Sequence, residues 1–556
     1  MKSEKSKFTS LLIYPPSADP TVPPISHSRL RPWIKALWNS EFLDENLAFV
    51  YYVVSSFFAS PSNNYSDSLY TKSIKEDLLK SLAIFKSNLF LDIKHYVAAY
   101  SILDRIFRLF SKIYYPSQIG YADIKLMYSP SQSEEIKNAI SDRGKNPFID
   151  FFSSKIDDYG FRDILAISVI YSSQIIAALT LAKLYKERYP DSFILLGGPA
   201  LFNINRDLRD KFEFIDHIAS LDGEYFFKNC SDLIKKMVKN RVSGGISRSK
   251  VDLANCNGFY EMKGPLPDYD TITLNRYLLP FPVVSLDITR GCYYRRCVFC
   301  AYGFNTAPYR VMPIKDVIRL IRNLKEKFNI NYFVFSVDVV DTRYLELLSE
   351  SIIESGIKIN YYIDARIEKK FNDNVFVDNL AKSGCRVVSF GMESACKNTL
   401  LKMGKGIEPD YFKDVFKNLH NHDIHINVNV IHGFPGESAD EIQKTLEFLL
   451  KNERLITTVG VSRFTLLRGS IMEKNYQNYG IDYISPVGDL NIWYKYKYEY
   501  PEGYPDYNLF LKRILKVFPL YGRLTGSTSD YLIYASKYSP RDIKELLRKA
   551  VELKLN

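Results

Sequence analysis

The chain has 556 residues, more than one ordinary hydrophobic core accommodates, so we expect two to four domains. Its hydrophobic content of 46% and charged content of 25% are typical of a globular protein, and its longest apolar stretch, residues 47–59, is too short to cross a bilayer. The net charge of +11 is spread along the chain rather than gathered into a tail, which favours a solvated surface over a nucleic-acid site.

The first residues are charged, and their apolar run, residues 11–14, is much shorter than the core of a signal peptide. We therefore expect a cytoplasmic protein with no membrane partner. Thiols stay reduced in that compartment, so none of the seven cysteines is expected to form a disulfide.

Three apolar runs in the N-terminal half are typical of buried parallel strands: residues 164–171, 193–199 and 214–219. An alanine- and leucine-rich helical segment that ends near residue 188 separates the first two. This alternation predicts a doubly wound α/β domain, with a ligand bound beyond the carboxyl ends of the strands. No G-x-G-x-x-G motif occurs, so we do not expect a dinucleotide.

Three of the cysteines, Cys292, Cys297 and Cys300, fall within nine residues, directly after a short apolar segment. Three thiolates on one loop suit an iron–sulfur cluster that leaves one iron open to another ligand. A structural zinc site needs four ligands, and the chain offers neither a second C-x-x-C pair nor a nearby histidine. The loop also carries basic side chains that are expected to lower the thiolate pKa and offset the charge of a cluster: Arg290, Arg295 and Arg296.

From residue 283 onward, strand-like runs alternate with helix-period segments. The expected strands are 283–288, 332–336, 358–363, 386–391, 424–431 and 459–466, and the expected helices are 314–328, 344–355, 374–383, 411–420 and 439–450. Regular alternation of this kind predicts a parallel sheet with helical crossovers. Six units fall short of the eight of a closed barrel, so we expect an open one.

Polar residues follow the predicted strands at the ends where active sites of such sheets gather. They are Asp338, Asp364 and Arg366, the segments 391–394 and 432–437, and Arg468. Glu437 has an alternative role as the cap of the helix that begins near residue 438. From residue 476 the chain is aromatic and lysine-rich, and then helical over 507–518 and 541–553. We hypothesise that this lobe closes over the mouth of the barrel, where its aromatic and basic residues either grip a peptide or pack a small domain.

The cysteine loop resembles the signature of the radical S-adenosylmethionine (radical SAM) superfamily, although four residues rather than three separate its first two cysteines. The resemblance implies that Cys292, Cys297 and Cys300 hold a [4Fe–4S] cluster whose fourth iron chelates S-adenosylmethionine. An electron from the cluster then cleaves this molecule to methionine and a 5′-deoxyadenosyl radical. The same family has an open six-unit barrel.

The resemblance also extends to the S-adenosylmethionine site. Phe299 matches the aromatic residue near the adenine, and Glu393 with Ser394 matches the fourth-strand motif that binds the ribose or the amino group. Arg366 matches a basic residue near the carboxylate, and Gly433 lies in the fifth-strand motif that borders the adenine. The run 401–406, Leu-Lys-Met-Gly-Lys-Gly, also recurs in related sequences.

The N-terminal half resembles the cobalamin-binding domain that precedes the barrel in one radical SAM branch. The resemblance rests on the order strand, Ser-x-x-x-x-Gln, helix, strand, Gly-Gly-Pro, strand and Asp-Gly-Glu, and on a first strand with a Pro-Pro turn at residues 8–17. It implies that cobalamin is bound near Ser168, Gln174, Gly197, Gly198 and Glu224. The Asp-x-His-x-x-Gly motif that donates histidine to cobalt in other cobalamin enzymes is absent, as it is in this branch.

Together these features predict an α/β chain with four parts. A Rossmann-like cobalamin-binding domain spans 1–245 and carries a mostly helical insertion at about 40–150, a linker spans 246–280, a partial (β/α)6 TIM-type radical SAM barrel spans 281–475, and a small α-rich C-terminal domain spans 476–556.

The closest resemblance is to cobalamin-type radical SAM proteins that modify ribosomally made peptides. It implies a C-methyltransferase that acts on an unactivated carbon of a peptide, with a reductant such as flavodoxin or ferredoxin as a further partner. The alternatives left open are a radical SAM epimerase, a crosslinking or cyclising enzyme without methyl transfer, and a non-catalytic cobalamin- or peptide-binding protein. A methylthiotransferase is disfavoured, because the chain has no cysteine before Cys230.

Overall fold

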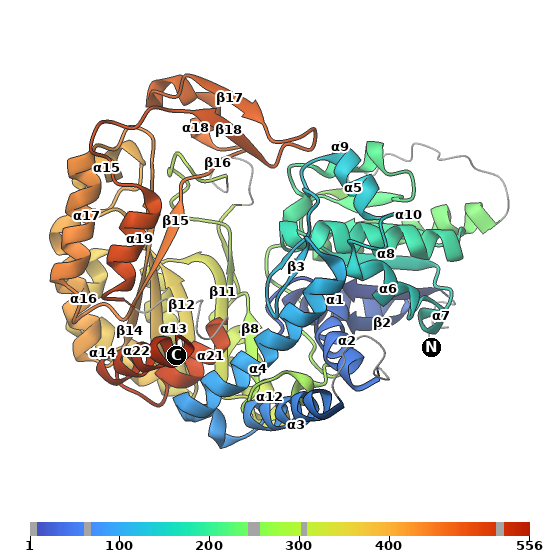
Figure 1. Ribbon diagram of the computed structural model, residues 1–556, viewed down its shortest axis with the longest axis horizontal. Helices are drawn as coiled ribbons and strands as arrows, with labels where there is room; N and C mark the ends of the chain where they lie inside the picture. Colours follow the sequence, from blue (N-terminus) through green and yellow to red (C-terminus); the bar gives the residue numbers. More distant parts are fainter. Residues whose placement is uncertain (1–7, 60–67, 243–255, 302–307, 519–526, 556) are drawn as a thin grey trace. The chain divides into compact units, whose positions relative to one another are not determined.

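The computed structural model describes residues 8–59, 68–242, 256–301, 308–518 and 527–555 (Figure 1). The chain forms two compact units. The first comprises Met1–Ala83, Ala99–Leu278 and Val487–Ile492, and the second comprises Ile84–Ala98, Leu279–Pro486 and Trp493–Asn556. Residues 246–255 of the expected linker lie outside the described ranges.

The first unit is built on a five-stranded parallel sheet with the order β2-β1-β5-β6-β7. Its strands are β1 (Thr9–Tyr14), β2 (Asn39–Asp44), β5 (Ile164–Ser168), β6 (Phe193–Gly197) and β7 (His217–Ala219). The helices between them include α1 (Ile25–Leu37), α8 (Ile175–Arg188) and α9 (Asn205–Lys211), and α10 (Gly223–Val242) follows the last strand. The chain runs from β1 to β2 on one side and to β5 on the other. The switch point where such sheets bind ligands therefore lies between β1 and β5.

The expected helical insertion at about 40–150 begins in a strand instead. The edge strand β2 is only partly buried, so its sequence shows no apolar run that would have revealed it. The helices α2 (Glu45–Ala59), α3 (Ser68–Phe85), α4 (Ile93–Ser111), α5 (Ser133–Ala139), α6 (Pro147–Ser153) and α7 (Ile156–Tyr159) follow, with a short hairpin of β3 (Gln118–Ile119) and β4 (Ile124–Lys125). The segment Ile84–Ala98 belongs to the second unit.

The expectation that no disulfide forms is wrong in this structure. Cys230 on α10 and Cys256 are joined by a disulfide with Cα atoms 5.8 Å apart. Both lie in one hydrophobic cluster with Trp38, Phe226 and Phe227. The two thiols meet because Cys256 lies in the same core cluster as Cys230, and cysteine count and compartment cannot reveal this placement.

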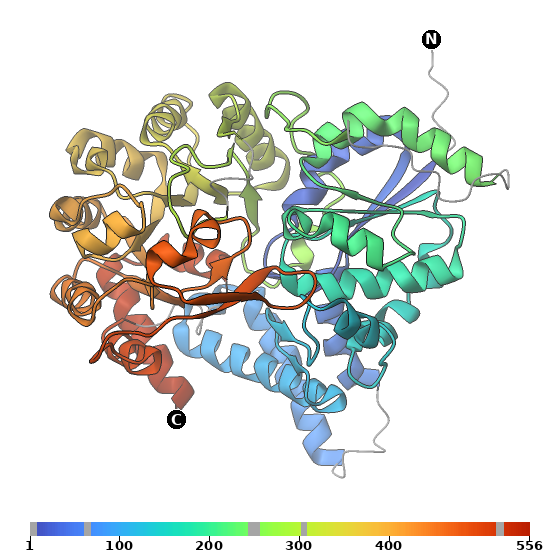
Figure 2. The ribbon, with the colours of Figure 1, turned by 90° about the horizontal axis from the view of Figure 1, so that it is seen from above.

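The second unit contains a six-stranded parallel sheet whose strands follow each other in chain order, β8-β11-β12-β13-β14-β15. They are β8 (Val283–Leu286), β11 (Tyr332–Val340), β12 (Asn360–Ala365), β13 (Cys385–Glu393), β14 (His425–His432) and β15 (Thr458–Arg463). The crossover helices are α12 (Ile314–Phe328), α13 (Thr342–Glu354), α14 (Asn374–Ser383), α16 (Phe412–Asn421) and α17 (Ala439–Lys451). Seen from above, these helices form an arc outside the sheet (Figure 2). The first and last strands do not pair, so the barrel is open as expected.

The segment after β15 contributes elements at both ends of the barrel strands. β16 (Leu466–Leu467), β17 (Tyr483–Pro486) and β18 (Trp493–Lys497) form an antiparallel sheet, with α18 (Ile471–Lys474) between the first two. Beyond α19 (Tyr507–Leu515), helix α21 (Thr528–Ala535) packs where the barrel strands begin, because the Ser536 hydroxyl contacts the Tyr332 hydroxyl at 3.4 Å and the His425 ring bonds the Tyr538 carbonyl at 3.0 Å. The C-terminal α22 (Pro540–Leu555) follows. Helix α21 therefore closes the end of the barrel opposite to the expected mouth.

None of the helices in the described ranges is both long and apolar enough to span a membrane.

Gly384, which joins α14 to β13, is expected to be irreplaceable. Its φ is +101°, and a Cβ there would lie 2.0 Å from the Ile359 carbonyl oxygen. Gly356 is a matched control, because its φ is +68° but a Cβ there would meet nothing within 4 Å. We expect Gly356→Ala to lower the free energy of unfolding by about 1 kcal/mol, and Gly384→Ala by roughly 3 kcal/mol, because the second adds overlap to backbone strain. Urea unfolding measures both, and equal losses would contradict the packing described.

Candidate functional site

The cysteine loop that follows β8 is fastened at several points. At its start, the Gly291 amide donates to Asp338 Oδ2 at 2.7 Å. In its middle, the Tyr294 hydroxyl donates to the Gly404 carbonyl at 2.9 Å, and the Val298 amide donates to the Met403 carbonyl at 3.0 Å. The loop therefore lies on the segment that follows α15 (Lys397–Lys402). In the described structure, Cys292, Cys297 and Cys300 are in no disulfide, and all three are partly exposed.

Two glycines of that segment make the close approach possible. Gly404 has φ +61°, and a Cβ there would lie 2.7 Å from the Arg296 carbonyl oxygen. Gly406 has φ +62°, and a Cβ there would lie 2.0 Å from the Tyr294 hydroxyl oxygen. The left-handed backbone and the contact both require glycine. The run 401–406, singled out in the sequence, is thus the surface on which the cysteine loop rests.

Three charged side chains from different elements meet beside this loop. Lys405 Nζ lies 2.8 Å from Glu393 Oε1, and both side chains are almost fully buried. Arg366, at the end of β12, donates to the Lys405 carbonyl at 2.6 Å and stacks on the Tyr294 ring, with its guanidinium carbon 3.6 Å from the ring centroid. Glu393 has φ +63°, an uncommon conformation for a residue with a side chain. Such strain is typical of functional positions.

The charges that act on the cysteines differ from those expected. Burial raises the pKa of the Cys297 thiol, and Lys405 and Arg366 partly oppose this shift. Arg290 instead forms an ion pair with Asp287, with Nε and Oδ2 2.7 Å apart. The sequence could not show this difference, because Arg366 and Lys405 reach Cys297 only through the packing of β12 and the 401–406 segment.

The residues present fit a cluster with a bound cofactor. Arg366 is buried, and its Nε has no hydrogen-bond partner among the described residues, so a donor is available beside the cysteine loop. An unpaired buried donor is costly unless a ligand accepts from it. Among the described residues, no three Cys, His, Asp or Glu side chains are gathered round the position of a single metal ion. Thiolates that each bind a different iron of a cluster are not expected to be gathered in this way.

Two other residues expected to bind S-adenosylmethionine, Phe299 and Ser394, contact side chains of the protein itself. Phe299 packs at the edge of a cluster that contains Met403, Ile431 and Phe434. The Ser394 hydroxyl is fully buried and hydrogen-bonds the Thr445 hydroxyl at 2.9 Å, so it joins β13 to α17. The described interactions of Ser394 are structural, and its role toward the cofactor stays a prediction.

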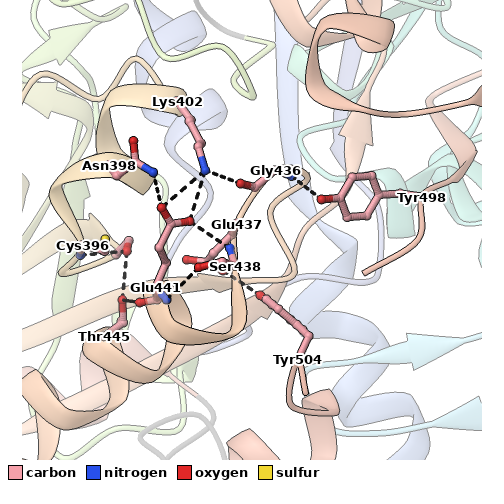
Figure 3. Close-up of polar contacts among 11 residues, drawn as sticks. Cys396, Asn398, Lys402, Gly436, Glu437, Ser438, Glu441, Thr445, Tyr498 and Tyr504 are labelled. Carbon is pink, nitrogen blue, oxygen red and sulfur yellow. Dashed lines mark hydrogen bonds and ion pairs between the residues drawn. The ribbon is translucent and has the colours of Figure 1, made fainter. Parts of the chain in front are cut away.

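Tyrosines from the segment after β18 hold the loop between β14 and α17. The Tyr500 hydroxyl donates to the Gly433 carbonyl at 2.6 Å, the Gly433 amide donates to the Tyr504 hydroxyl at 3.0 Å, and the Gly436 amide donates to the Tyr498 hydroxyl at 2.8 Å. Figure 3 shows Tyr498 and Tyr504 reaching this loop from one side, while Lys402 reaches the Gly436 carbonyl from the other. The hypothesis that the C-terminal region covers the barrel mouth is therefore supported for this segment.

Glu437 is not the helix cap. Ser438 caps α17 and forms a capping box with Glu441. Glu437 instead accepts a hydrogen bond from the Tyr504 hydroxyl at 2.6 Å, and burial raises the pKa of its carboxyl to about 7. His432 bonds the Pro505 carbonyl at 3.0 Å and packs against Phe510. Both residues therefore fasten the C-terminal segment to the barrel.

In the first unit, two predicted cofactor residues carry structural contacts, Gln174 at the switch point and Glu224 after the edge strand β7. Gln174 is fully buried; its side chain donates to the Pro15 carbonyl at 2.6 Å and accepts from the Ile170 and Tyr171 amides, so it ties the end of β1 to the end of β5. Glu224, at the start of α10, is buried in an ion pair with Arg29 at 3.2 Å.

The other three predicted residues lie at neighbouring strand ends. Ser168 ends β5, and Gly197, paired with it, ends β6. Gly198 has φ +122°, and a Cβ there would lie 2.2 Å from the Val169 carbonyl oxygen. The structure thus brings Ser168, Gly197 and Gly198 together, while a role of any of the five in cobalamin binding stays a prediction.

Sequence reasoning missed Lys405 and Tyr294. Lys405 lies inside a motif that was recognised but given no role. Tyr294 could have been singled out in the sequence, because it lies between the first two cysteines and an aromatic ring there can stack on a basic side chain.

Comparison with known proteins agrees with this geometry. Residues 286–449 match the family model of the Radical SAM superfamily. The chain is 28% identical over 303 residues to an uncharacterized methyltransferase of Pyrococcus horikoshii, covering 52% of this chain and 64% of that protein. It is 26% identical over 252 residues to the hopanoid C-3 methylase of Methylococcus capsulatus, covering 44% of this chain and 48% of that protein. It thus spans less than two thirds of either relative.

The fold is similar to that of TsrM from Kitasatospora setae, a radical S-adenosylmethionine methyltransferase solved with cobalamin and a [4Fe–4S] cluster bound. The TM-score is 0.56 at 11% sequence identity, over 98% of this chain and 99% of that one. The residues that match the Radical SAM model, 286–449, include strands β11, β12, β13 and β14 of the second unit, where the domain was expected. A radical SAM domain implies a [4Fe–4S] cluster and S-adenosylmethionine.

Gly406→Ala is expected to impair cluster assembly, because the new methyl group would displace Tyr294 and the cysteine loop with it. Gly436→Ala is the matched control: its φ is +89°, but the nearest atom to a Cβ there is Lys402 Cδ at 3.8 Å. After anaerobic reconstitution, the iron content per chain should fall at least about twofold in Gly406→Ala and stay near the wild-type value in Gly436→Ala, as expected if only the first creates steric overlap. Normal iron content in Gly406→Ala would contradict the docking described.

Glu437→Gln is expected to change how stability depends on pH. Burial raises the Glu437 pKa from 4.5 to about 7, so the folded protein binds more protons than the unfolded chain in that window. The free energy of unfolding therefore falls as pH rises through it, by roughly 3 kcal/mol from this group. Urea unfolding at several pH values should show a smaller fall in Glu437→Gln, while Glu447→Gln on the exposed side of α17 should match the wild type. Identical slopes in all three proteins would exclude the burial of Glu437.

Proposed function

We propose that the protein is a cobalamin-dependent radical SAM methyltransferase that methylates an unactivated carbon. The observation that carries the proposal is the seating of the cysteine loop against Arg366, Lys405 and Glu393. One site thereby joins three thiols, a buried guanidinium with an unpaired Nε, and a buried ion pair. The relatives named as methyltransferases support the reaction class.

The residues of the barrel would hold the cofactor in defined roles. Arg366 Nε is suited to donate to a carboxylate, and its guanidinium cannot rotate away because the Tyr294 ring and the Lys405 carbonyl hold it. Glu393 is suited to accept from an amino or hydroxyl group, and Lys405 Nζ holds its Oε1 at 2.8 Å. When bound, the cluster would supply the electron that cleaves S-adenosylmethionine. The cover of C-terminal tyrosines on the loop after β14 would exclude water.

The first unit supplies the proposed cobalamin site. From β1 the chain adds strands in opposite directions, β2 on one side and β5 on the other. Doubly wound sheets bind cofactors at such a switch point, here between β1 and β5. Gly197 and Gly198 leave the end of β6 without side chains, so a large flat ring could approach the backbone there. When bound, cobalamin would carry the methyl group to be transferred. The cobalamin in the structurally similar TsrM supports this assignment.

The proposed substrate is a ribosomally made peptide. Exposed aromatic and basic side chains, including Tyr483, Lys495 and Lys497, lie on the antiparallel sheet beside the tyrosines that cover the barrel. Such surfaces suit extended peptides, because aromatic rings stack and lysines attract acidic groups. A one-electron reductant such as flavodoxin or ferredoxin is the further partner that the proposal requires.

The proposal is tested with anaerobically reconstituted protein, S-adenosylmethionine, a strong reductant and methylcobalamin. We expect 5′-deoxyadenosine from the wild type and a loss of at least about a hundredfold in Cys297→Ala, because one of three cluster ligands is removed. Cys385→Ala, a buried thiol on the same sheet, is the matched control and should keep the activity.

A peptide encoded beside the gene should gain the mass of one CH2 group per modification. Deoxyadenosine with an unchanged or otherwise altered peptide would favour epimerisation, crosslinking or cyclisation. The absence of deoxyadenosine would favour a non-catalytic binding protein.

A further inference from the structure

A row of polar side chains crosses the inner face of the six-stranded sheet. In the strand register Asp364 pairs with Ser389, Ser389 with Asn427, and Asn427 with Thr458. Residues paired in this way on parallel strands point to the same face. The alternate residue Phe390 packs against Phe371 and Phe416 outside the sheet. The row therefore faces inward.

Hydrogen bonds link the row from strand to strand. Asn427 and Asn429 each donate from Nδ2 to Ser389 Oγ, at 3.0 and 3.3 Å. Thr458 Oγ1 donates to Asn427 Oδ1 at 2.9 Å. Branched apolar side chains normally fill such interiors, since polar groups there cost free energy unless they are paired. A polar row at this position therefore needs a reason beyond packing.

Asn429, which hydrogen-bonds to Ser389 of the row, is the position at which a ligand could reach it. This side chain is exposed although β14 lies between two other strands. Its neighbours in register are Gly391 on one side and Gly460 on the other, so neither covers it. A Cβ at Gly460 would lie 2.6 Å from Asn429 Oδ1, and thus any side chain there would block this oxygen. Two glycines leave the amide oxygen accessible.

The opposite side of the row is closed. Tyr531 of α21 packs against the ring of His425, two residues before Asn427 on β14, with ring centroids 5.9 Å apart. Beside it, the Tyr362 hydroxyl donates to Asp364 Oδ1 at 3.3 Å. Burial raises the pKa of the Asp364 carboxyl to about 6. Towards the carboxyl ends of the strands, Glu393 follows Gly391 on the same strand, and Lys405 pairs with it. A molecule on Asn429 would therefore lie between the closed floor and the proposed S-adenosylmethionine site.

We propose that Asn429, supported by Ser389 and Asn427, is a substrate subsite that takes a hydrogen-bond donor, namely a hydroxyl or an amine. Asn429 uses Nδ2 within the row, so the atom that it presents is an acceptor, and its partner must donate. Among the described residues, Oδ1 has no protein donor. A hydrocarbon group would bury this oxygen unpaired. The inference rests on the proposed function, because it is the radical site above the row that makes a molecule bound there a substrate.

The test uses two probes of equal size, cyclohexanol, which donates, and cyclohexanone, which only accepts. Dissociation constants are measured by ligand-observed NMR on the reconstituted protein with S-adenosylmethionine. The wild type is expected to bind cyclohexanol about fivefold more tightly, the effect of one net hydrogen bond. The preference should vanish in Asn429→Leu and persist in Asn429→Asp, which keeps an acceptor.

Asn421→Leu, the same change at an exposed position of α16, is the control and should keep the wild-type preference. Equal binding of the two probes by the wild type, or a preference that survives in Asn429→Leu, would overturn the inference. If Asn429→Leu does not fold, loss of the preference in Asn429→Asp would overturn the inference instead.

Failure of the proposed function is seen separately, as absence of 5′-deoxyadenosine from the wild-type preparation. A preparation that cleaves S-adenosylmethionine without a probe preference refutes only the subsite. A preference without cleavage refutes only the proposed function.

Discussion

The functional site depends on one contact, in which the cysteine loop lies on the backbone of residues 401–406. Left-handed glycines at 404 and 406 let Tyr294 and the Arg296 carbonyl approach to distances that a side chain would forbid. The same segment carries Lys405, which brings a positive charge towards Cys297 and forms an ion pair with Glu393. A single close approach thus sets both the position of the thiols and the electrostatics around them.

The surroundings of this contact are fastened by polar groups rather than by apolar packing alone. Thr445 ties β13 to α17 through Ser394, and Lys402 ties α15 to the loop after β14. Tyrosines of the C-terminal segment then hold that loop from its other side. Directional bonds of this kind fix a site more sharply than dispersion forces, which tolerate small shifts. These bonds therefore hold the loops around the cysteine loop in place.

The sequence predicted most of the second unit because its signals are local. Most strands contain several apolar residues and the crossover helices have an apolar face, such as Val317, Leu320, Ile321 and Leu324 on α12, so element type and order could be read directly. The edge strand β2 escaped because half-exposed strands lack that run. The Cys230–Cys256 disulfide, and the placement of α21 under the barrel, escaped because they join segments far apart in the chain.

By itself, the sequence determined the chemistry of the site: three cysteines in one loop, the glycines of the 401–406 run, and charged residues where strands end. These are properties of residue type and spacing, which the chain carries whether or not it is folded. Only the tertiary structure decided which charges meet. It brought Arg366 and Lys405 to Cys297, and it aligned Asp364, Ser389 and Asn427 in one row. The physical reason is that side-chain partners across a parallel sheet are set by register, which arises from packing of the whole unit.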